Sequence, residues 1–222
     1  MAANTAQVHC SGVSRIMLKG AQYTAPPTLS KIRVTDHWRW SASDTVYLDA
    51  SCVAVRTKPA SGSQGAITRE VVGEVSYTST SSHFTRVYGA MRHSGDIMDF
   101  RERAGKHTMD IDLAGLGLGI DELFFLASIF HGKPLRSVQQ PLISIEDPDT
   151  GMELCSFCMN NVRAGAPISD TAIVMCRVFR GHGRWHVQAL GETGPGDLSR
   201  QGALRRTMLR AVERKDGASA SQ

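Results

Sequence analysis

The amino-acid sequence predicts an all-β protein, folded as a β-sandwich of two sheets and followed by one amphipathic helix near the C-terminus. Two observations lead to this fold class. Apolar residues recur at every second position over most of the 222-residue chain. Clusters of Gly, Pro, Ser and Asp, such as residues 58–65 and 147–151, separate these segments. Many short strands at this spacing favour a sandwich over alternating strands and helices.

The predicted strands are about ten short segments in chain order. In residues 108–113, Met109, Ile111 and Leu113 alternate with polar residues, as in a strand with one buried face. The two glycines in residues 180–183 predict a hairpin turn, because glycine accepts positive φ. The expected strands are residues 16–18, 32–34, 46–54, 71–77, 84–88, 108–113, 123–130, 142–145, 152–157, 171–179 and 185–190.

The helical period occurs in one segment near the C-terminus. Leu204, Met208 and Val212 share one face of a helix there. We therefore divide the chain into a sandwich domain (1–198), a basic amphipathic helix (199–216) and a disordered tail (217–222).

The positive charge is concentrated in that helix. Residues 199–216 contain six basic and two acidic residues, and so carry the whole net charge of +4. The sandwich is neutral overall, which excludes a basic nucleic-acid scaffold. Arg206, Arg210 and Arg214 lie on the polar face of the helix and are the candidate partner-binding residues, for an acidic protein, RNA or an anionic membrane surface.

The cellular compartment is predicted from what the sequence lacks. No stretch approaches the roughly 20 apolar residues of a membrane-spanning helix, and the first 12 residues contain no apolar run typical of a signal peptide. The five cysteines are an odd number and are widely spread, unlike a secreted disulfide framework. We expect a cytoplasmic protein.

Neither a zinc site nor an enzyme is expected. Cys155 and Cys158 precede His182 and His186, but 23 residues separate the two pairs, against about 12 in a zinc finger. The cysteines are therefore interpreted as structural thiols. The sequence has no nucleophile elbow of the form G-x-S-x-G, so an unrecognised hydrolase is kept only as a weaker alternative.

Several motifs occur in an order that is typical of one protein family. Tyr47-Leu48-Asp49-Ala50-Ser51 is similar to the motif D-L-D-A-S, and Ser94-Gly95-Asp96 to the start of an S-G-D loop. The alternating strand that ends at Leu113 is similar to a strand ending V-D-L, and residues 149–154 to D-T-G-E-E-L. In these motifs, and in their shared order over about 170 residues, the chain resembles the TerD family of tellurium-resistance and stress-response proteins.

The resemblance implies a compact β-sandwich that binds calcium through clustered carboxylates. Such a hard cation takes six to eight oxygen ligands, so several acidic residues must converge on it. Asp49 and Asp96 match family ligands. Asp96 and Leu113 are 17 positions apart, which is the family's spacing, so the loop between them keeps its length.

The charge of that loop departs from the family pattern. Tyr47 stands at the first Asp of D-L-D, and Arg103, Lys106 and His107 stand where the family has acids. Asp44 and Asp99 lie nearby in the sequence, but the motif does not place them in the site. We expect calcium binding to be weak or absent, with Arg103 or Lys106 neutralising the surviving carboxylates.

The sequence therefore predicts a non-enzymatic, TerD-like stress-response binding protein with a degenerate calcium site. Its partners are expected to be other proteins or a second copy of itself. The alternative is an adaptor in which the Arg-rich helix binds an acidic partner, RNA or an anionic membrane.

Overall fold

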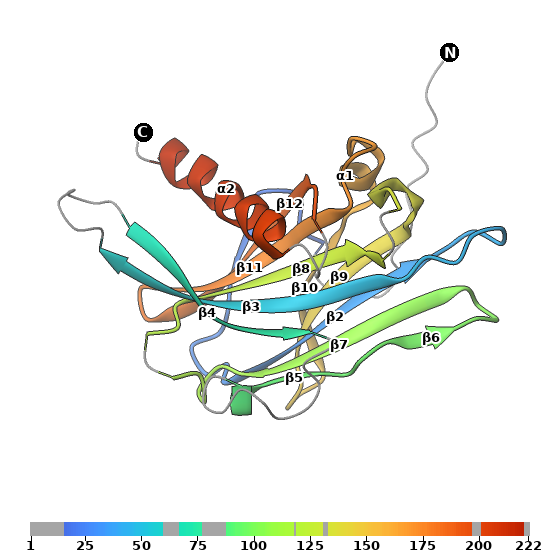
Figure 1. The fold of residues 1–222 in the computed structure, drawn as a ribbon. Coiled ribbons are helices and arrows are strands. Elements are labelled where there is room, and N and C mark those ends of the chain that lie inside the picture. The colour runs from blue at the N-terminus through green and yellow to red at the C-terminus, as the bar shows by residue number, and fades with distance from the viewer. Residues whose placement is uncertain are drawn as a thin grey trace, which may run out of the picture.

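Two antiparallel sheets pack face to face, and a helix covers the outer side of one of them (Figure 1). The structure is a computed structural model that describes residues 16–59, 67–76, 88–117, 119–130, 133–196 and 201–219. The two-sheet sandwich with a C-terminal helix predicted from the sequence is confirmed. No helix within the described ranges is long and apolar enough to cross a membrane.

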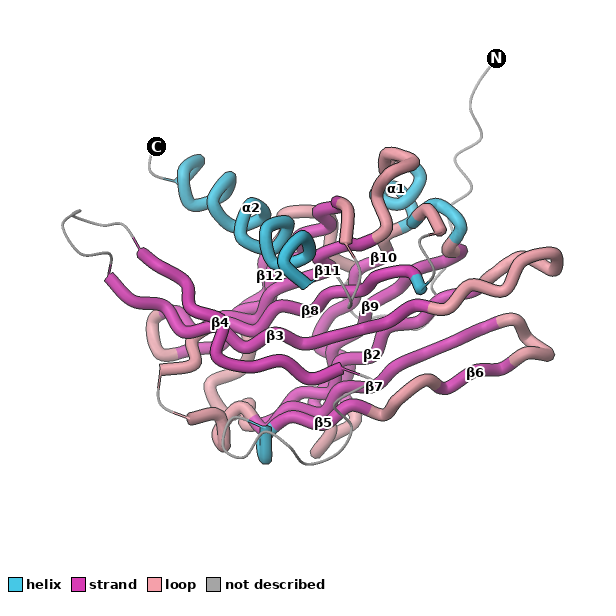
Figure 2. The backbone as a smooth tube through the Cα atoms, in the orientation of Figure 1, coloured by secondary structure: helices cyan, strands magenta, loops and turns pink. Residues whose placement is uncertain are grey.

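Each sheet brings together strands that are distant in the sequence (Figure 2). Sheet I has the spatial order β1 (Gln22–Thr24), β12 (Arg184–Gly194), β11 (Ala172–Gly181), β8 (Glu122–Ile129), β3 (Leu48–Pro59) and β4 (Ile67–Ser76). Sheet II has the order β10 (Met152–Cys158), β9 (Gln139–Asp147), β2 (Lys31–Arg39), β7 (Ala104–Asp112) and β5 (Met91–His93), and β6 (Ile97–Asp99) also pairs with β7. The short helical elements are the 3-10 turns η2 (Tyr88–Ala90) and η4 (Leu135–Ser137) and helix α1 (Asn160–Ala164).

The main core lies between the sheets and follows the period of two along each strand. On β2, Ile32, Val34, Asp36 and Trp38 point inward, while the alternate residues Arg33, Thr35 and His37 are more exposed. The buried Trp38 indole N–H donates to the Val46 carbonyl at 2.9 Å, which satisfies its one polar group. Alternation thus determines which residues of β2 and β7 reach the interior.

Helix α2 (Gln201–Ser219) builds a second, smaller core on the outer face of sheet I. Leu204, Met208 and Val212 pack there against Phe124 and Leu126 of β8 and other sheet residues. A Cβ at Gly194 would lie 2.5 Å from the Thr207 hydroxyl oxygen, so this glycine permits the close approach of helix and strand. Because both its faces are covered, β8 is buried along its whole length.

Several expected boundaries differ from the observed ones. The helix continues to Ser219, so residues 217–219, expected in a disordered tail, are helical, and residues 220–222 lie outside the described ranges. The segment at 16–18 forms a single bridge from Ile16 to Ser156 rather than a strand. Most of the expected strand at 84–88 also lies outside the described residues.

The hairpin predicted at residues 180–183 is present. It joins β11 to β12 through His182 and Gly183, with φ of 48° and 73°. Positive φ at both central residues is the type I′ geometry, whose twist matches that of the flanking strands.

Candidate functional site

A buried histidine lies between two carboxylates at the centre of the candidate site. His107 is on β7 and points inward, directly opposite Asp36 in the β2–β7 register. Its Nδ1 lies 3.0 Å from Asp36 Oδ2, and its Nε2 lies 2.9 Å from Asp96 Oδ1. The His107 side chain is fully buried, and its ring stacks on Trp38 with centroids 4.8 Å apart. The imidazole therefore bridges the buried Asp36 and Asp96, whose side chain is 35% exposed at the edge of the sandwich.

The hydrogen bonding of His107 indicates its charge. Ionised carboxylates only accept hydrogen bonds, so both ring nitrogens donate when the ring is an imidazolium. Burial lowers the pKa of His107, but Asp36 and Asp96 outweigh burial, and the pKa is raised above its ordinary value. The arrangement favours a charge-assisted Asp–His–Asp bridge, in which His107 and Asp36 are shielded from water and Asp96 is partly solvated.

A second histidine, His93 on β5, is held in the opposite protonation state. The Gly95 backbone N–H donates to His93 Nδ1 at 2.9 Å, which leaves the proton of the neutral ring on Nε2. Its ring lies 5.1 Å from that of His107. Burial, followed by repulsion from His107, lowers the pKa of His93 to about 4. The surroundings therefore favour the charged form of His107 and the neutral form of His93.

Two polar atoms of this cluster have no hydrogen-bond partner within the described parts of the chain. They are Asp36 Oδ1 and His93 Nε2, and both are buried. An unsatisfied buried polar atom costs about 1–3 kcal/mol, so the cluster is not optimised for stability alone.

Asp49 and Asp96, the two carboxylates predicted from the sequence as calcium ligands, lie apart in the structure. Asp96 belongs to the Asp–His–Asp arrangement. Asp49 is an even number of positions from Val53 and Val55 on β3, so the three side chains share one face of the strand. Val53 and Val55 pack beneath α2, which places Asp49 on the outer face of sheet I. Asp36 and His107 instead point between the sheets.

The cations expected to neutralise these acids lie elsewhere. Arg103 is exposed in the β6–β7 turn with φ of 52°, and Lys106 is exposed on β7. Neither makes an ion pair with any residue that the structure describes. The expectation that Arg103 or Lys106 neutralises Asp96 is wrong, because alternation along β7 points His107 inward and Lys106 outward.

The other acids and the aromatic residue singled out in the sequence have separate surroundings. Asp44 pairs with Lys133. Asp99 Oδ1 accepts the N–H groups of Arg101 and Glu102 and so caps the β6–β7 turn. Tyr47, which replaces a family acid, is partly exposed, and its carbonyl accepts the Phe130 N–H at 3.1 Å.

Comparison with known proteins identifies the family. The TerD domain matches residues 15–201. The chain belongs to the TerD domain family. Tellurium resistance protein TerZ of Serratia marcescens is 24% identical over 157 residues, which are 71% of this chain and 71% of that protein. The crystal structure of a homologue of telluride resistance protein (TerD) from Streptomyces coelicolor A3(2) matches with a TM-score of 0.54 and 18% identity, covering 77% of this chain and 94% of that one. This last likeness supports the fold.

The residues of this TerD-domain chain do not fit a calcium ion at the matched positions. Calcium needs six to eight converging oxygens. In the described residues, no group of three or more His, Cys, Asp or Glu side chains is arranged to hold a metal ion. Asp96 Oδ1 is already bonded to His107, and Asp49 lies on a different face.

The cysteine and histidine residues considered for zinc are also dispersed. Cys155 is buried in the main core. His186 has Nδ1 within 3.1 Å of Gln22 and Thr24, and its Nε2 lies 3.0 Å from the Gly181 carbonyl. His182 is in the hairpin turn. The absence of zinc binding stays a prediction.

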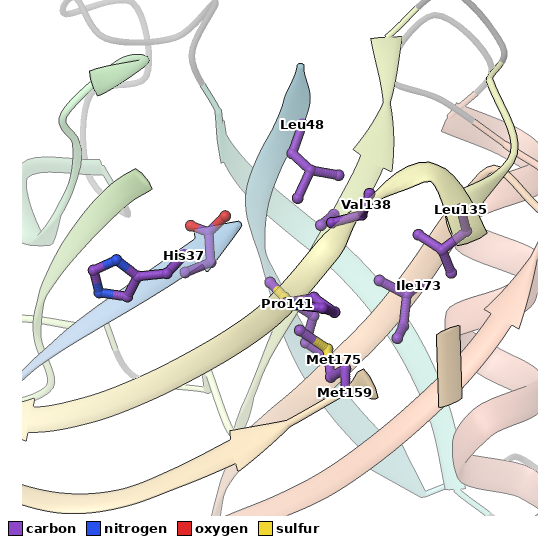
Figure 3. Close-up of a pocket in the computed structure, with 10 residues that line it drawn as sticks. His37, Leu48, Leu135, Val138, Pro141, Met159, Ile173 and Met175 are labelled. Atoms are coloured by element: carbon purple, nitrogen blue, oxygen red, sulfur yellow. The ribbon is translucent and has the colours of Figure 1, made fainter. Parts of the chain in front are cut away.

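A small pocket opens beside Asp36 (Figure 3). Its lining is apolar except at Asp36 and His37, and the ring of His37 points away from the apolar side chains (Figure 3). Room for about one water molecule remains inside. A wider hollow lies on the outer face of sheet II, where Lys31 pairs with Asp149 at 3.0 Å and Arg33 with Asp110 at 2.7 Å.

The arginines of α2 differ in their surroundings. Arg206 and Arg210 are exposed, and Arg210 donates to the Thr207 hydroxyl at 3.2 Å. Arg205, which the sequence did not single out, lies 3.9 Å from Glu74 of β4. The side chain of Arg214 lies outside the described part of the structure.

Sequence reasoning missed Asp36 and His93. A signal for Asp36 was present, because it follows Ile32 and Val34 at alternate positions and precedes Trp38, so a strand that buries these residues also buries an acid. His93 carried no such signal, since its three-residue strand is too short for a period to be recognised.

Proposed function

We propose that this TerD-domain chain is a non-enzymatic binding protein of the tellurium-resistance type, and that His107 takes the place of calcium in its acidic site. The observation that carries the proposal is the fully buried imidazole between Asp36 and Asp96. A positive charge supplied by the chain itself balances carboxylates that would otherwise need a metal ion. The protein is then folded and competent to bind at any calcium concentration.

Electrostatics supports this exchange. An imidazolium 4–6 Å from a calcium ion repels it by about 6–8 kcal/mol at an effective dielectric constant of 20. A loss of this size converts micromolar binding into no measurable binding. Calcium entry would therefore require His107 to lose its proton.

The non-enzymatic part of the proposal is supported by how the reactive groups are enclosed. His107 and Asp36 are buried side chains that bond to each other, and the pocket beside Asp36 has room for about one water molecule. A substrate could not reach this pair without opening the core. We place the protein in the cytoplasm and expect it to work through surface contacts with other proteins or with a second copy of itself.

The test is calcium-dependent melting of three proteins. The unmodified chain should melt at the same temperature in 1 mM calcium and in chelator. His107→Glu places a third carboxylate between Asp36 and Asp96, so it should be less stable in chelator and should recover in calcium. His107→Gln removes the same charge without adding an acid, and should lose stability without any response to calcium.

A calcium-dependent rise in the melting temperature of the unmodified protein would contradict the proposal. Such a rise would mean that backbone carbonyls or other acids complete a site despite His107.

A second candidate function rests on α2. Arg206 and Arg210 are exposed on a helix whose apolar side is fully used against sheet I, so they are available to an acidic partner. Binding to immobilised polyglutamate should weaken steeply with salt, and Arg206→Gln with Arg210→Gln should reduce it. The matched control is Arg184→Gln, an exposed arginine in the β11–β12 hairpin. An equal loss of polyglutamate binding in the α2 variant and in Arg184→Gln would argue against binding through α2.

A further inference from the structure

Exposed aromatic side chains gather at one end of the sandwich. Among the described residues, the large aromatic side chains classed as exposed are Tyr47, Phe100 and Phe130, with exposed fractions of 37%, 62% and 43%. Tyr47 precedes β3 and Phe130 follows β8, and the two are joined by a backbone hydrogen bond. Phe100 lies in the β6–β7 turn, which projects at the same end as the β2–β3 connection (Figure 1).

The β6–β7 turn is braced so that Phe100 stays exposed. Asp99 Oδ1 accepts the N–H groups of Arg101 and Glu102 at 3.0 and 2.9 Å. From the neighbouring connection, the Arg39 guanidinium donates to the Glu102 carbonyl at 2.7 Å, and the Trp40 N–H donates to the Arg103 carbonyl at 3.1 Å. Such a cross-linked turn presents its apolar residue with little loss of conformational entropy on binding.

The charges around Phe100 are unevenly compensated. Glu102 pairs with Arg39, and Asp44 pairs with Lys133. Arg101, Arg103 and Lys106 are exposed and have no ion pair within the described residues. Lys106 lies directly across from the exposed Ile97 in the β6–β7 register. Apolar side chains are thus flanked by three cations that make no ion pair in the described part of the chain and by the carboxylate of Asp99, which accepts backbone N–H groups.

We propose that this end of the sandwich, the Phe100 tip (residues 97–106), docks on an anionic lipid bilayer. Phe100 and Ile97 would enter the interfacial region, while Arg101, Arg103 and Lys106 would contact the lipid phosphates. Tyr47 is of the side-chain type that prefers the membrane–water boundary. The attachment is peripheral and is independent of the site at His107.

The shape of the tip favours a bilayer over a macromolecular partner. A stable protein interface buries about 800 Å² on each side, which a single projecting turn does not present. Nucleic-acid binding needs a basic groove with several stacking platforms, whereas Phe100 lies on a protruding turn and not in a groove (Figure 1). A bilayer, by contrast, accepts the insertion of a small convex apolar tip.

The test is cosedimentation of the full chain with vesicles, in chelator. Binding is expected to vesicles of phosphatidylcholine with 25–30% phosphatidylserine, roughly the anionic content that such basic clusters recognise, and not to phosphatidylcholine alone. Phe100→Ser should abolish detectable binding. Arg101→Gln and Arg103→Gly should each weaken it about fivefold, and glycine suits the positive φ at position 103.

Two matched controls locate the contact. Met152→Ser removes an apolar side chain that is 52% exposed at the start of β10, at the opposite end of sheet II, and should leave binding unchanged. Arg206→Gln with Arg210→Gln removes cations from α2 and should also leave it unchanged. Phe100→Trp should give a blue-shifted emission on binding, because the three native tryptophans are already buried.

Three results would overturn the proposal. The first is no preference for anionic vesicles by the unmodified chain. The second is loss of binding in the α2 variant with retention in Phe100→Ser, which would place the contact on the helix. The third is tight binding of a fluorescent oligonucleotide that is lost in Phe100→Ser while vesicles remain unbound, which would assign the tip to nucleic acid.

Discussion

Replacing His107 by Gln is the perturbation that tests the buried site most directly. Gln fills a similar volume and keeps one hydrogen-bond donor, but it cannot carry the positive charge between Asp36 and Asp96. Removing one partner of a buried ion pair costs about 3–5 kcal/mol, because the remaining charge stays buried without compensation. Asp36 is only 1% exposed, so bulk solvent does not solvate it once the partner is lost.

The assay is chemical denaturation at neutral pH, analysed as a double-mutant cycle. His107→Gln should lower the free energy of unfolding by about 3–5 kcal/mol, or the melting temperature by about 6–20 °C for a chain of this size. Asp36→Asn alone should cost less, since His107 keeps Asp96. The double variant should be more stable than the sum of the single changes predicts, by about 1–3 kcal/mol.

The pH dependence gives a second readout of the same variant. The pKa of His107 is raised in the folded protein, so its stabilising contribution is complete below about pH 6.5, its unfolded value, and is lost as the pH rises through the folded pKa. The stability gap between the unmodified protein and His107→Gln should therefore narrow in alkaline buffer. Any of three results would refute the charged bridge. They are a loss of less than about 1 kcal/mol in the unfolding free energy of His107→Gln, strictly additive effects in the double-mutant cycle, and a stability difference between the two proteins that widens with pH.

Three further predictions concern the surroundings of the site and the helix. The ring signals of His93 should titrate near pH 4 by NMR, so stability should fall as the pH drops from about 6.5 towards 4; titration near 6.5 would show that the ring is not buried as described. Gly105→Ala should destabilise by at least about 1–3 kcal/mol in denaturant melts, because the new Cβ would lie 2.2 Å from the Trp38 ring; an unchanged midpoint would contradict this packing. Leu204→Asp should lower the melting temperature several times more than Arg206→Gln, which changes stability by about 0–1 kcal/mol; equal small effects would mean that the helix is not docked.

Much of the architecture could be predicted because it depends on local pattern. Alternation in residues 108–113 predicted a buried strand face, and the glycines of residues 180–183 predicted a hairpin turn, whose type I′ geometry came from the structure. The apolar positions of α2 gave its docking face. The short strands β1, β5 and β6 were missed, since three residues carry no period and such strands form only by pairing with longer neighbours.

By itself, the sequence determined the fold class, the strand faces and the positions of Arg103, Lys106 and His107 after Asp96. It did not determine which of these residues pairs with Asp96. Asp36 and His107 are 71 positions apart, and only the antiparallel register of β2 and β7 places them opposite each other. The same alternation sends His107 into the core and Lys106 to the surface, although both are basic residues one position apart. Charge can be counted from a sequence, but the pairing of charges depends on register and face, which tertiary packing sets.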